Sequence, residues 1–157
     1  MKYSRLTKEQ FEALHQEFIN FLATQSITGD EWTSIKENQP EVAEEELDVF
    51  SDLVWEGALS KAEYLENISA RQLFLFKLGE TQMKLIGLKI TQEEIDITTK
   101  EGYSWLQQNY ASDGVEFFTS AKDYSKDRNA DIFAFIEQGS VITKGELYEF
   151  FNKIIEK

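Results

Sequence analysis

The chain has 157 residues, 41% of them hydrophobic and 13% aromatic, so it is long and apolar enough to bury the core of a globular domain. Twenty-nine Asp and Glu against sixteen Lys and Arg give a net charge of −13, which disfavours binding to the phosphate backbone of nucleic acids. The absence of Cys excludes disulfides, thiolate zinc sites and cysteine nucleophiles.

No stretch of the sequence has the features of a secretion signal or a membrane span. The N-terminus, MKYSRLTKEQFEAL, lacks the roughly 7–15 consecutive apolar residues of a signal peptide. No apolar run approaches the roughly 20 residues needed to cross a bilayer. We therefore expect a soluble, cytoplasmic protein that has no membrane partner.

A helix-start pattern recurs along the chain. A Ser or Thr followed three residues later by Glu or Gln is typical of a capping box, in which two side chains satisfy the first free N–H groups of a helix. The pattern occurs at Thr7, Thr28, Ser60, Thr98 and Thr143. It predicts a helix after each of these residues.

Hydrophobic spacing gives the extent of the elements in the first part of the chain. Apolar residues at helical spacing predict a helix over 8–24 and another over 29–38. Pro40 and Gly57 are typical of a helix beginning and end, so the acidic stretch between them is expected to be helical over 41–57. A short helix is predicted over 61–68.

The pattern then changes to strands. The runs QLFLFKL (72–78) and MKLIGLKI (83–90) flank a four-residue turn and predict a β-hairpin. The remaining elements are a helix over 99–110, a strand over 115–121, a segment at 131–137 for which Asn129 and Gly139 favour a helix, and a helix over 144–156. The predicted fold is α+β, a single domain over 1–157 with a helical part over 1–68 and a small antiparallel sheet with packed helices over 69–157.

The helix over 41–57 carries an acidic stripe. At 100° per residue, its carboxylates fall within an arc of about 80° and the apolar residues fall on the other side. The acidic residues are Glu41, Glu45, Asp48, Asp52 and Glu56; the apolar residues are Val42, Leu47, Val49, Phe50, Leu53 and Val54. Few basic residues lie one turn away, so neighbouring carboxylates repel by about 0.2–0.5 kcal/mol per pair.

Three interpretations of the stripe remain open. It is the solvated face of an amphipathic helix, or a binding surface for a basic protein, or a site for a divalent cation. In the second interpretation Trp55, which projects toward the acidic side, is an exposed aromatic anchor. In the third, carboxylates one turn apart would have to converge on one ion.

Few other residues indicate chemistry. His15 is the only His, and without a nucleophile or orienting acid nearby in the sequence it is expected to be a boundary residue of its helix. The segment 127–138 begins like a calcium loop but has Ile132 where a Gly is required. No motif for a phosphate, a metal or a cofactor is present, so none is predicted.

Three stretches, MKYSRLTKEQFEALHQEFINFLATQSI, EVAEEELDVFSDLVWEGAL and VITKGELYEFF, resemble a family of small bacterial proteins of unknown function. The resemblance spans nearly the whole chain. It implies a bacterial, cytoplasmic setting and no activity, so no functional residue is carried over from it.

The sequence favours a non-enzymatic interaction protein, of adaptor or immunity type, in which Glu41, Glu45, Asp48, Asp52 and Glu56 face a basic partner and Trp55 anchors it. The alternative is an enzyme or small-ligand protein with a pocket between the sheet and the C-terminal helices. Its candidate residues are Tyr103, Tyr110, Tyr124, Tyr148 and His15. A third possibility, a subunit of a larger complex, predicts an exposed apolar patch.

Overall fold

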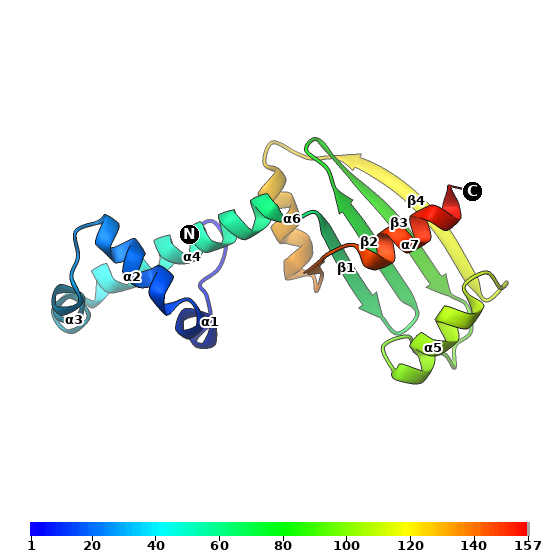
Figure 1. Cartoon of the computed structure of the whole chain (residues 1–157), viewed down its shortest axis with the longest axis horizontal. Coiled ribbons are helices and arrows are strands. Elements are labelled where there is room, and N and C mark those ends of the chain that lie inside the picture. Colours follow the sequence, from blue (N-terminus) through cyan, green and yellow to red (C-terminus); the bar gives the residue numbers. More distant parts are fainter. Residues whose placement is uncertain (157) are drawn as a thin grey trace. The chain divides into compact units, whose positions relative to one another are not determined.

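The computed structural model describes residues 1–156 and divides them into two compact units (Figure 1). The first, Met1–Ser60, is entirely helical and is called the helical unit below. The second begins at Lys61, contains all the strands and is called the sheet unit. The predicted α+β class is confirmed, with helices first and an antiparallel sheet with further helices after them.

Four helices make up the helical unit: α1 (Lys8–Ala13), α2 (His15–Thr24), α3 (Gly29–Asn38) and α4 (Pro40–Lys61), whose last residue lies past the unit boundary. Thr7 and Thr28 cap α1 and α3 as predicted, because each hydroxyl accepts from the N–H three residues later. The prediction of one helix over 8–24 is wrong, since the backbone leaves helical geometry at Leu14. The predicted end of the acidic helix at Gly57 is also wrong, because α4 continues to Lys61.

An aromatic cluster forms the core of the helical unit. The Phe18 ring lies 5.1 Å from the Phe50 ring and 5.2 Å from Trp32, both edge to face, a favoured arrangement of aromatic pairs. Leu6 and Leu22 are buried in the same cluster. Phe11, Ile27 and Trp32 are half-buried and pack against this core.

The sheet unit contains five antiparallel strands in the order β4-β3-β2-β1-β5. They are β1 (Tyr64–Ser69), β2 (Gln72–Leu78), β3 (Gln82–Ile90), β4 (Val115–Asp123) and β5 (Val141–Thr143), and the helices are α5 (Lys100–Asn109), α6 (Arg128–Glu137) and α7 (Glu146–Ile155). The hairpin of 72–78 with 83–90, the strand at 115–121 and the helices at 99–110, 131–137 and 144–156 are therefore confirmed to within a few residues.

Two parts of the sheet unit differ from the prediction. The segment expected as a helix over 61–68 is strand β1, which pairs with β2 along its whole length and with β5. Strand β5 was not predicted at all. The predicted caps at Ser60, Thr98 and Thr143 are wrong: no helix begins after Ser60, Thr99 caps α5 in place of Thr98, and the residue before α7 is Gly145.

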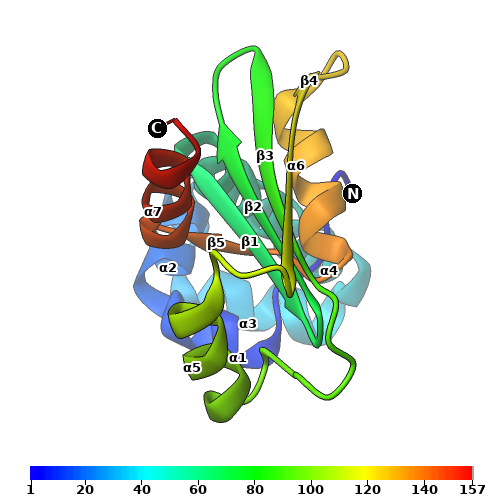
Figure 2. The ribbon, with the colours of Figure 1, turned by 90° about the vertical axis from the view of Figure 1, so that its right-hand side faces the viewer.

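Helices cover both faces of the sheet (Figure 2). α5 and α7 lie on one face, over a core that includes Leu73, Leu88, Leu106 and Phe151. α6 lies on the other face, where Phe135 contacts Phe76 of β2 with ring centroids 4.9 Å apart. Within residues 1–156, no helix is both long and apolar enough to cross a membrane.

Candidate functional site

The N-terminal segment of the chain lies along the acidic side of α4. Arg5 donates from Nε and Nη2 to Asp48 Oδ1, at 2.8 and 2.6 Å, and from Nη1 to Glu44. The next residue, Leu6, is buried, and its N–H donates to the hydroxyl of Ser51 at 3.1 Å. These contacts fix the segment on α4.

The same segment reaches the next two carboxylates of the stripe. The backbone N–H groups of Lys2 and Tyr3 donate to Asp52 at 2.8 and 2.9 Å, and the Tyr3 hydroxyl donates to Glu56. Burial of the Tyr3 hydroxyl and its bond to Glu56 raise the pKa of Tyr3 to about 12.

These contacts explain a stripe that lacks basic residues at helical spacing. Glu44, Asp48, Asp52 and Glu56 are spaced by one turn each, and each accepts hydrogen bonds from residues 2–5. The compensating donors lie 39–54 positions away in the sequence, so a local pattern could not reveal them. Three of the predicted partner-binding carboxylates, Asp48, Asp52 and Glu56, are thus engaged by the chain itself.

Trp55 does not stand open beside the carboxylates. It is half-buried and packs against the aromatic cluster of Phe18 and Phe50. The expected orientation, an exposed indole on the acidic side, is therefore corrected. The reason is that the cluster wraps further around α4 than the apolar arc of the sequence indicates.

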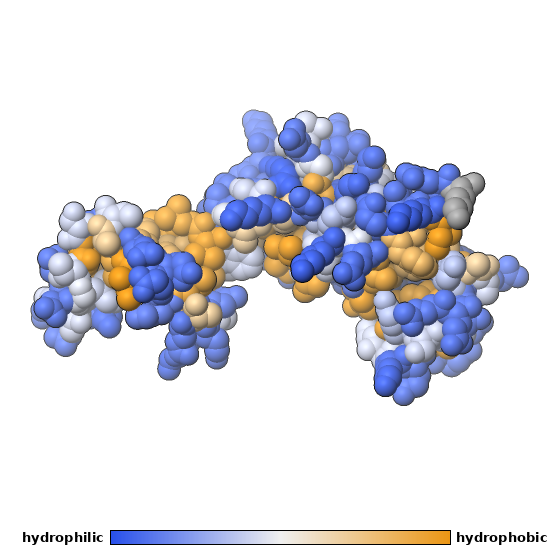
Figure 3. Space-filling view, viewed as in Figure 1, coloured by the Kyte–Doolittle hydropathy of each residue, from blue (hydrophilic) through white to orange (hydrophobic). Residues whose placement is uncertain are grey.

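A different part of α4 is apolar and exposed. Val42, Val49 and Leu53 have 38%, 51% and 56% of their surface accessible, and they lie at i, i+7 and i+11, on one helical ridge. We call these three residues the apolar ridge. Glu41 and Glu45 are exposed beside it. Figure 3 shows apolar surface along the middle of α4.

The predicted apolar side of α4 is thus divided in two. Phe50 is buried and Leu47 and Val54 pack against the core, whereas the apolar ridge faces solvent. Hydrophobic periodicity identified all six residues but could not decide which of them the other helices cover. Glu46, at the border of the ridge, accepts from Gln25 Nε2 at 2.7 Å.

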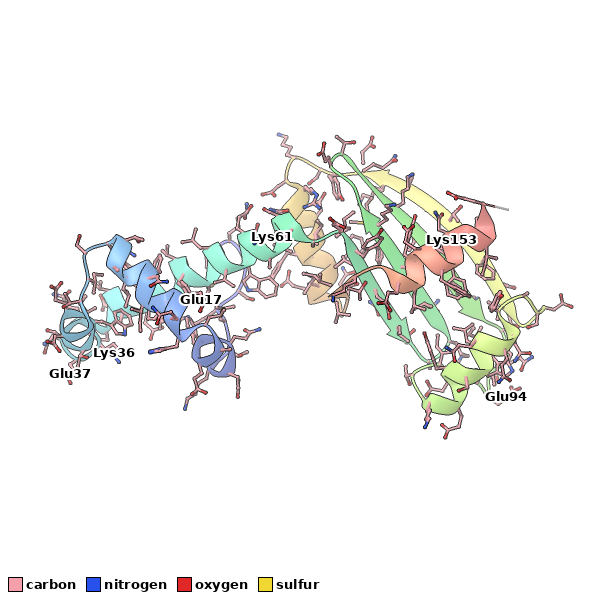
Figure 4. All side chains as sticks on the ribbon, in the orientation of Figure 1. Glu17, Lys36, Glu37, Lys61, Glu94 and Lys153 are labelled. Atoms are coloured by element: carbon pink, nitrogen blue, oxygen red, sulfur yellow. The ribbon has the colours of Figure 1, made fainter. Side chains whose placement is uncertain are left out.

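A groove of about 460 Å³ lies on the helical unit, between α2 and α3. Its wall is largely apolar and includes Phe18 and Trp32, with His15 and Lys36 at its polar edge. Lys36 projects from α3 (Figure 4), and its ammonium lies 5.9 Å from the centroid of the Trp32 ring. The structure places His15 in this groove, in the helical unit and not in the sheet unit where the alternative hypothesis needs it.

The other residues of that hypothesis are also dispersed. Tyr103 and Tyr110 line a groove of about 350 Å³ between α5 and α7. Tyr148 is buried in the core, 4% exposed. Tyr124 follows strand β4, where Arg128 lies over its ring, 5.7 Å from the centroid. Only two of the five predicted residues therefore share a groove.

Glu66 lies beside this groove, in a recess that it lines together with Tyr103 and Thr143. Burial raises the pKa of the Glu66 carboxyl, and burial together with the nearby Glu66 charge raises the pKa of the Tyr103 hydroxyl. The sequence did not indicate Glu66 as a site residue, because the segment 61–68 was predicted to be a helix. Strand β1 is what directs the Glu66 side chain toward α5 and α7.

A pocket of about 330 Å³ lies on the opposite face of the sheet, beside α6. Its apolar wall consists of Phe74, Phe76, Met83, Leu85, Ala121 and Phe135, and its polar residues are Asn67, Ser120, Lys122, Gln138 and Ser140. None of the five candidate residues of the alternative hypothesis lines this pocket.

Comparison with protein families adds one result. A family model described as a family of unknown function matches residues 1–156. The chain belongs to the DUF6495 family. The predicted resemblance to a family of unknown function is therefore confirmed. No curated protein and no solved structure matches this DUF6495 chain.

The geometry of this DUF6495 chain offers two kinds of surface for binding. One is the apolar ridge of α4 with its acidic border, which is open and convex and suits a protein segment. The other is the pocket beside α6, which is concave and suits a small molecule. In residues 1–156, no three His, Asp or Glu side chains gather in a way that could hold a metal ion.

Proposed function

We propose that this protein is a non-enzymatic interaction module that binds a basic, amphipathic helix of a protein partner along α4. The observation that carries the proposal is the apolar ridge of Val42, Val49 and Leu53, exposed on a helix whose opposite side is already packed. Exposed apolar residues in line on one helix are typical of helix-in-groove and helix-on-helix recognition.

Burial of the ridge supplies part of the binding free energy. Fully burying a Val or Leu side chain is worth about 1.5–3 kcal/mol, and these three are about half exposed, so each contributes about 1 kcal/mol. The total of about 3 kcal/mol is well short of the roughly 8 kcal/mol of a micromolar complex. Polar contacts at the border must supply the rest.

The charge of the helical unit indicates which partner can supply it. The unit holds thirteen Asp and Glu against four Lys and Arg, a net charge of −9. Glu41 and Glu45 border the ridge, and no cation among residues 1–156 forms an ion pair with either. A partner with Lys or Arg beside its apolar residues would pair with them, whereas a second copy of this chain would be repelled.

The N-terminal segment supports the same partner chemistry. Lys2, Tyr3 and Arg5 already satisfy one side of α4 with basic and aromatic groups. The partner is therefore expected on the side that the segment leaves open, where the ridge and Glu45 lie. Glu41 and Glu45 remain from the predicted set as contact residues, and the ridge replaces Trp55 as the apolar anchor.

The test uses two synthetic helical peptides that share one leucine face and differ in the flanking residues, Lys in one and Glu in the other. Binding to the full chain is measured by fluorescence anisotropy at low and high salt. The Lys peptide is expected to bind and to weaken with added salt, and the Glu peptide to bind at least tenfold more weakly.

Matched variants locate the binding. Leu53→Lys and Glu45→Lys should each weaken the Lys peptide about tenfold, a loss of about 1.4 kcal/mol. The controls are Val141→Lys, at an equally exposed apolar residue of the sheet unit, and Glu80→Lys, which changes the net charge by the same amount. The proposal is refuted if the controls weaken binding as much as the α4 variants do.

A further inference from the structure

The face of the sheet beside α6 is built from cross-strand rows. The registers align Ser120, Leu85 and Phe76 in one row and Phe118, Gly87 and Phe74 in the next. α6 covers part of this face through the contact of Phe135 with Phe76. The pocket of about 330 Å³ is the part that α6 leaves open.

The aromatic wall of the pocket continues beyond its edge. The Phe118 ring lies across Gly87, where a Cβ would come within 2.1 Å of a ring carbon, and reaches Phe74 of the next strand but one with centroids 6.1 Å apart. Phe118 remains 44% exposed. Because Gly87 has no side chain, the ring lies over the sheet and extends a flat apolar surface next to the pocket.

The polar residues lie at two ends. Ser120 and Lys122 are on β4. Among residues 1–156, Lys122 is the only charged residue that lines the pocket, in a chain whose net charge is −13. Asn67 is on β1, three strands away, and Gln138 and Ser140 follow α6. With strands about 4.8 Å apart, the backbones of the two ends are separated by about 14 Å.

Ser140 has an unusual environment for a hydroxyl. It is 2% exposed, and its Oγ has no hydrogen-bond partner among residues 1–156. Its backbone is held firmly, because its N–H donates to Phe135 O and the N–H of Gly139, at φ +110°, donates to Ile136 O, which is the pattern of a Schellman motif. Ser140 therefore has a fixed backbone and an unsatisfied hydroxyl, and it lines one end of the pocket.

We infer that this pocket binds a small aromatic carboxylate that carries a hydroxyl at its far end. Lys122 pairs with the carboxylate and Ser120 donates to it, the ring lies on Phe74, Phe76 and Leu85, and the ligand hydroxyl bonds Ser140. The single cation selects an anion, the flat wall selects a ring, and the Ser140 hydroxyl selects a polar tip. The site lies in the sheet unit, so its failure would leave the proposal for α4 unaffected.

Three probes separate these contributions: 3-(4-hydroxyphenyl)propionate, the amide of the same acid, and 3-phenylpropionate, which lacks the hydroxyl. Binding to the full chain is followed by the chemical shifts of ¹⁵N-labelled backbone amides. We expect the largest shifts in β2, β3, β4 and residues 138–140. The hydroxyphenyl acid should bind about tenfold more tightly than the amide and about threefold more tightly than the phenyl acid.

Two variants assign the ends of the ligand. Lys122→Met should remove the preference for the acid over the amide, and Ser140→Ala should remove the preference for the hydroxyphenyl acid over the phenyl acid. Lys84→Met, on the next strand, and Ser104→Ala, at an exposed position of α5, are the controls and should keep both preferences.

Three results would each overturn the inference. They are a lack of binding at millimolar probe concentration, shifts centred on the groove between α5 and α7, and equal affinity for the three probes. A water molecule as the only partner of Ser140 would show as equal affinity for the two acids, in the parent chain as well as in Ser140→Ala, and would overturn the assignment of the ligand hydroxyl.

Discussion

The same substitution at two buried serines is expected to change stability in opposite directions. Ser51 of α4 is fully buried, and its hydroxyl accepts from the N–H of Leu6 and donates to Leu47 O at 2.7 Å. Ser140 is buried to nearly the same degree, and no partner for its hydroxyl is found in residues 1–156. Ser51→Ala and Ser140→Ala delete the same atoms from these two environments.

The magnitudes follow from what each deletion leaves behind. Ser51→Ala leaves the N–H of the buried Leu6 without an acceptor, and such a group costs about 1–3 kcal/mol of stability. Ser140→Ala leaves no donor or acceptor unpaired. The hydroxyl that it removes has lost its water on folding and gained no hydrogen bond in return, so the substitution should raise the stability of the chain by about 1 kcal/mol. The two variants should therefore differ by about 2–4 kcal/mol.

Urea denaturation of the two variants and the parent chain measures this difference. The fluorescence of Trp32 and Trp55 reports on the helical unit and that of Trp105 on the sheet unit. In variants that keep only one of the three Trp residues, the fluorescence therefore follows the unfolding of one unit at a time. The reasoning is refuted if Ser140→Ala destabilises the chain as much as Ser51→Ala does. Its hydroxyl would then be satisfied in the free protein.

Two further predictions concern backbone packing and pH. Gly102→Ala should destabilise the chain by about 3 kcal/mol in a urea titration, because the new Cβ would lie 1.7 Å from Asp96 O. The control is Gly57→Ala on α4, where the Cβ would meet open space, and it should stabilise the chain by about 0.5–1 kcal/mol. Equal effects of the two substitutions would contradict this reasoning. The raised pKa of Tyr3 means that the folded chain keeps this proton to higher pH than the unfolded chain. The stabilising contribution of the Tyr3 hydroxyl is complete below pH 10 and is lost as the pH rises toward about 12. Tyr3→Phe should therefore reduce the fall of the urea midpoint between pH 10 and about 12. An unchanged fall would show that the bond from Tyr3 to Glu56 does not cause this pH dependence.

Helix starts were predictable where the cap and the helix are formed by the same few residues. Thr7 and Thr28 satisfy N–H groups three positions ahead, a contact that needs nothing from the rest of the chain. The same pattern at Thr143 failed because that residue is held in β5, paired with Tyr64. Its hydroxyl accepts from Gly145 N instead.

The misassigned segment 61–68 shows a related limit. Its residues carry no strong strand signal, and β1 exists because β2 and β5 supply hydrogen bonds on both of its sides. Strand formation of this kind depends on partners that are distant in the sequence. Helical preference estimated from the segment alone could not include them.

For the candidate sites, the sequence identified the acidic and apolar residues of α4 but not their surroundings. Whether a carboxylate repels its neighbour or binds a donor depends on the N-terminal segment, and Arg5 lies 43 positions from Asp48. Whether an apolar residue is core or exposed surface depends on which helices pack there, as Phe50 and Leu53 show on the same helix.

The sequence by itself determined the fold class, most of the elements and the excess of negative charge in the helical unit, because these follow from contacts within a few residues and from composition. The tertiary structure decided that Trp55 packs in the core, that the apolar ridge is exposed, and that Ser140 is buried beside a pocket. Each of these depends on side chains brought together from distant positions, and periodicity within one element carries no information about what covers it.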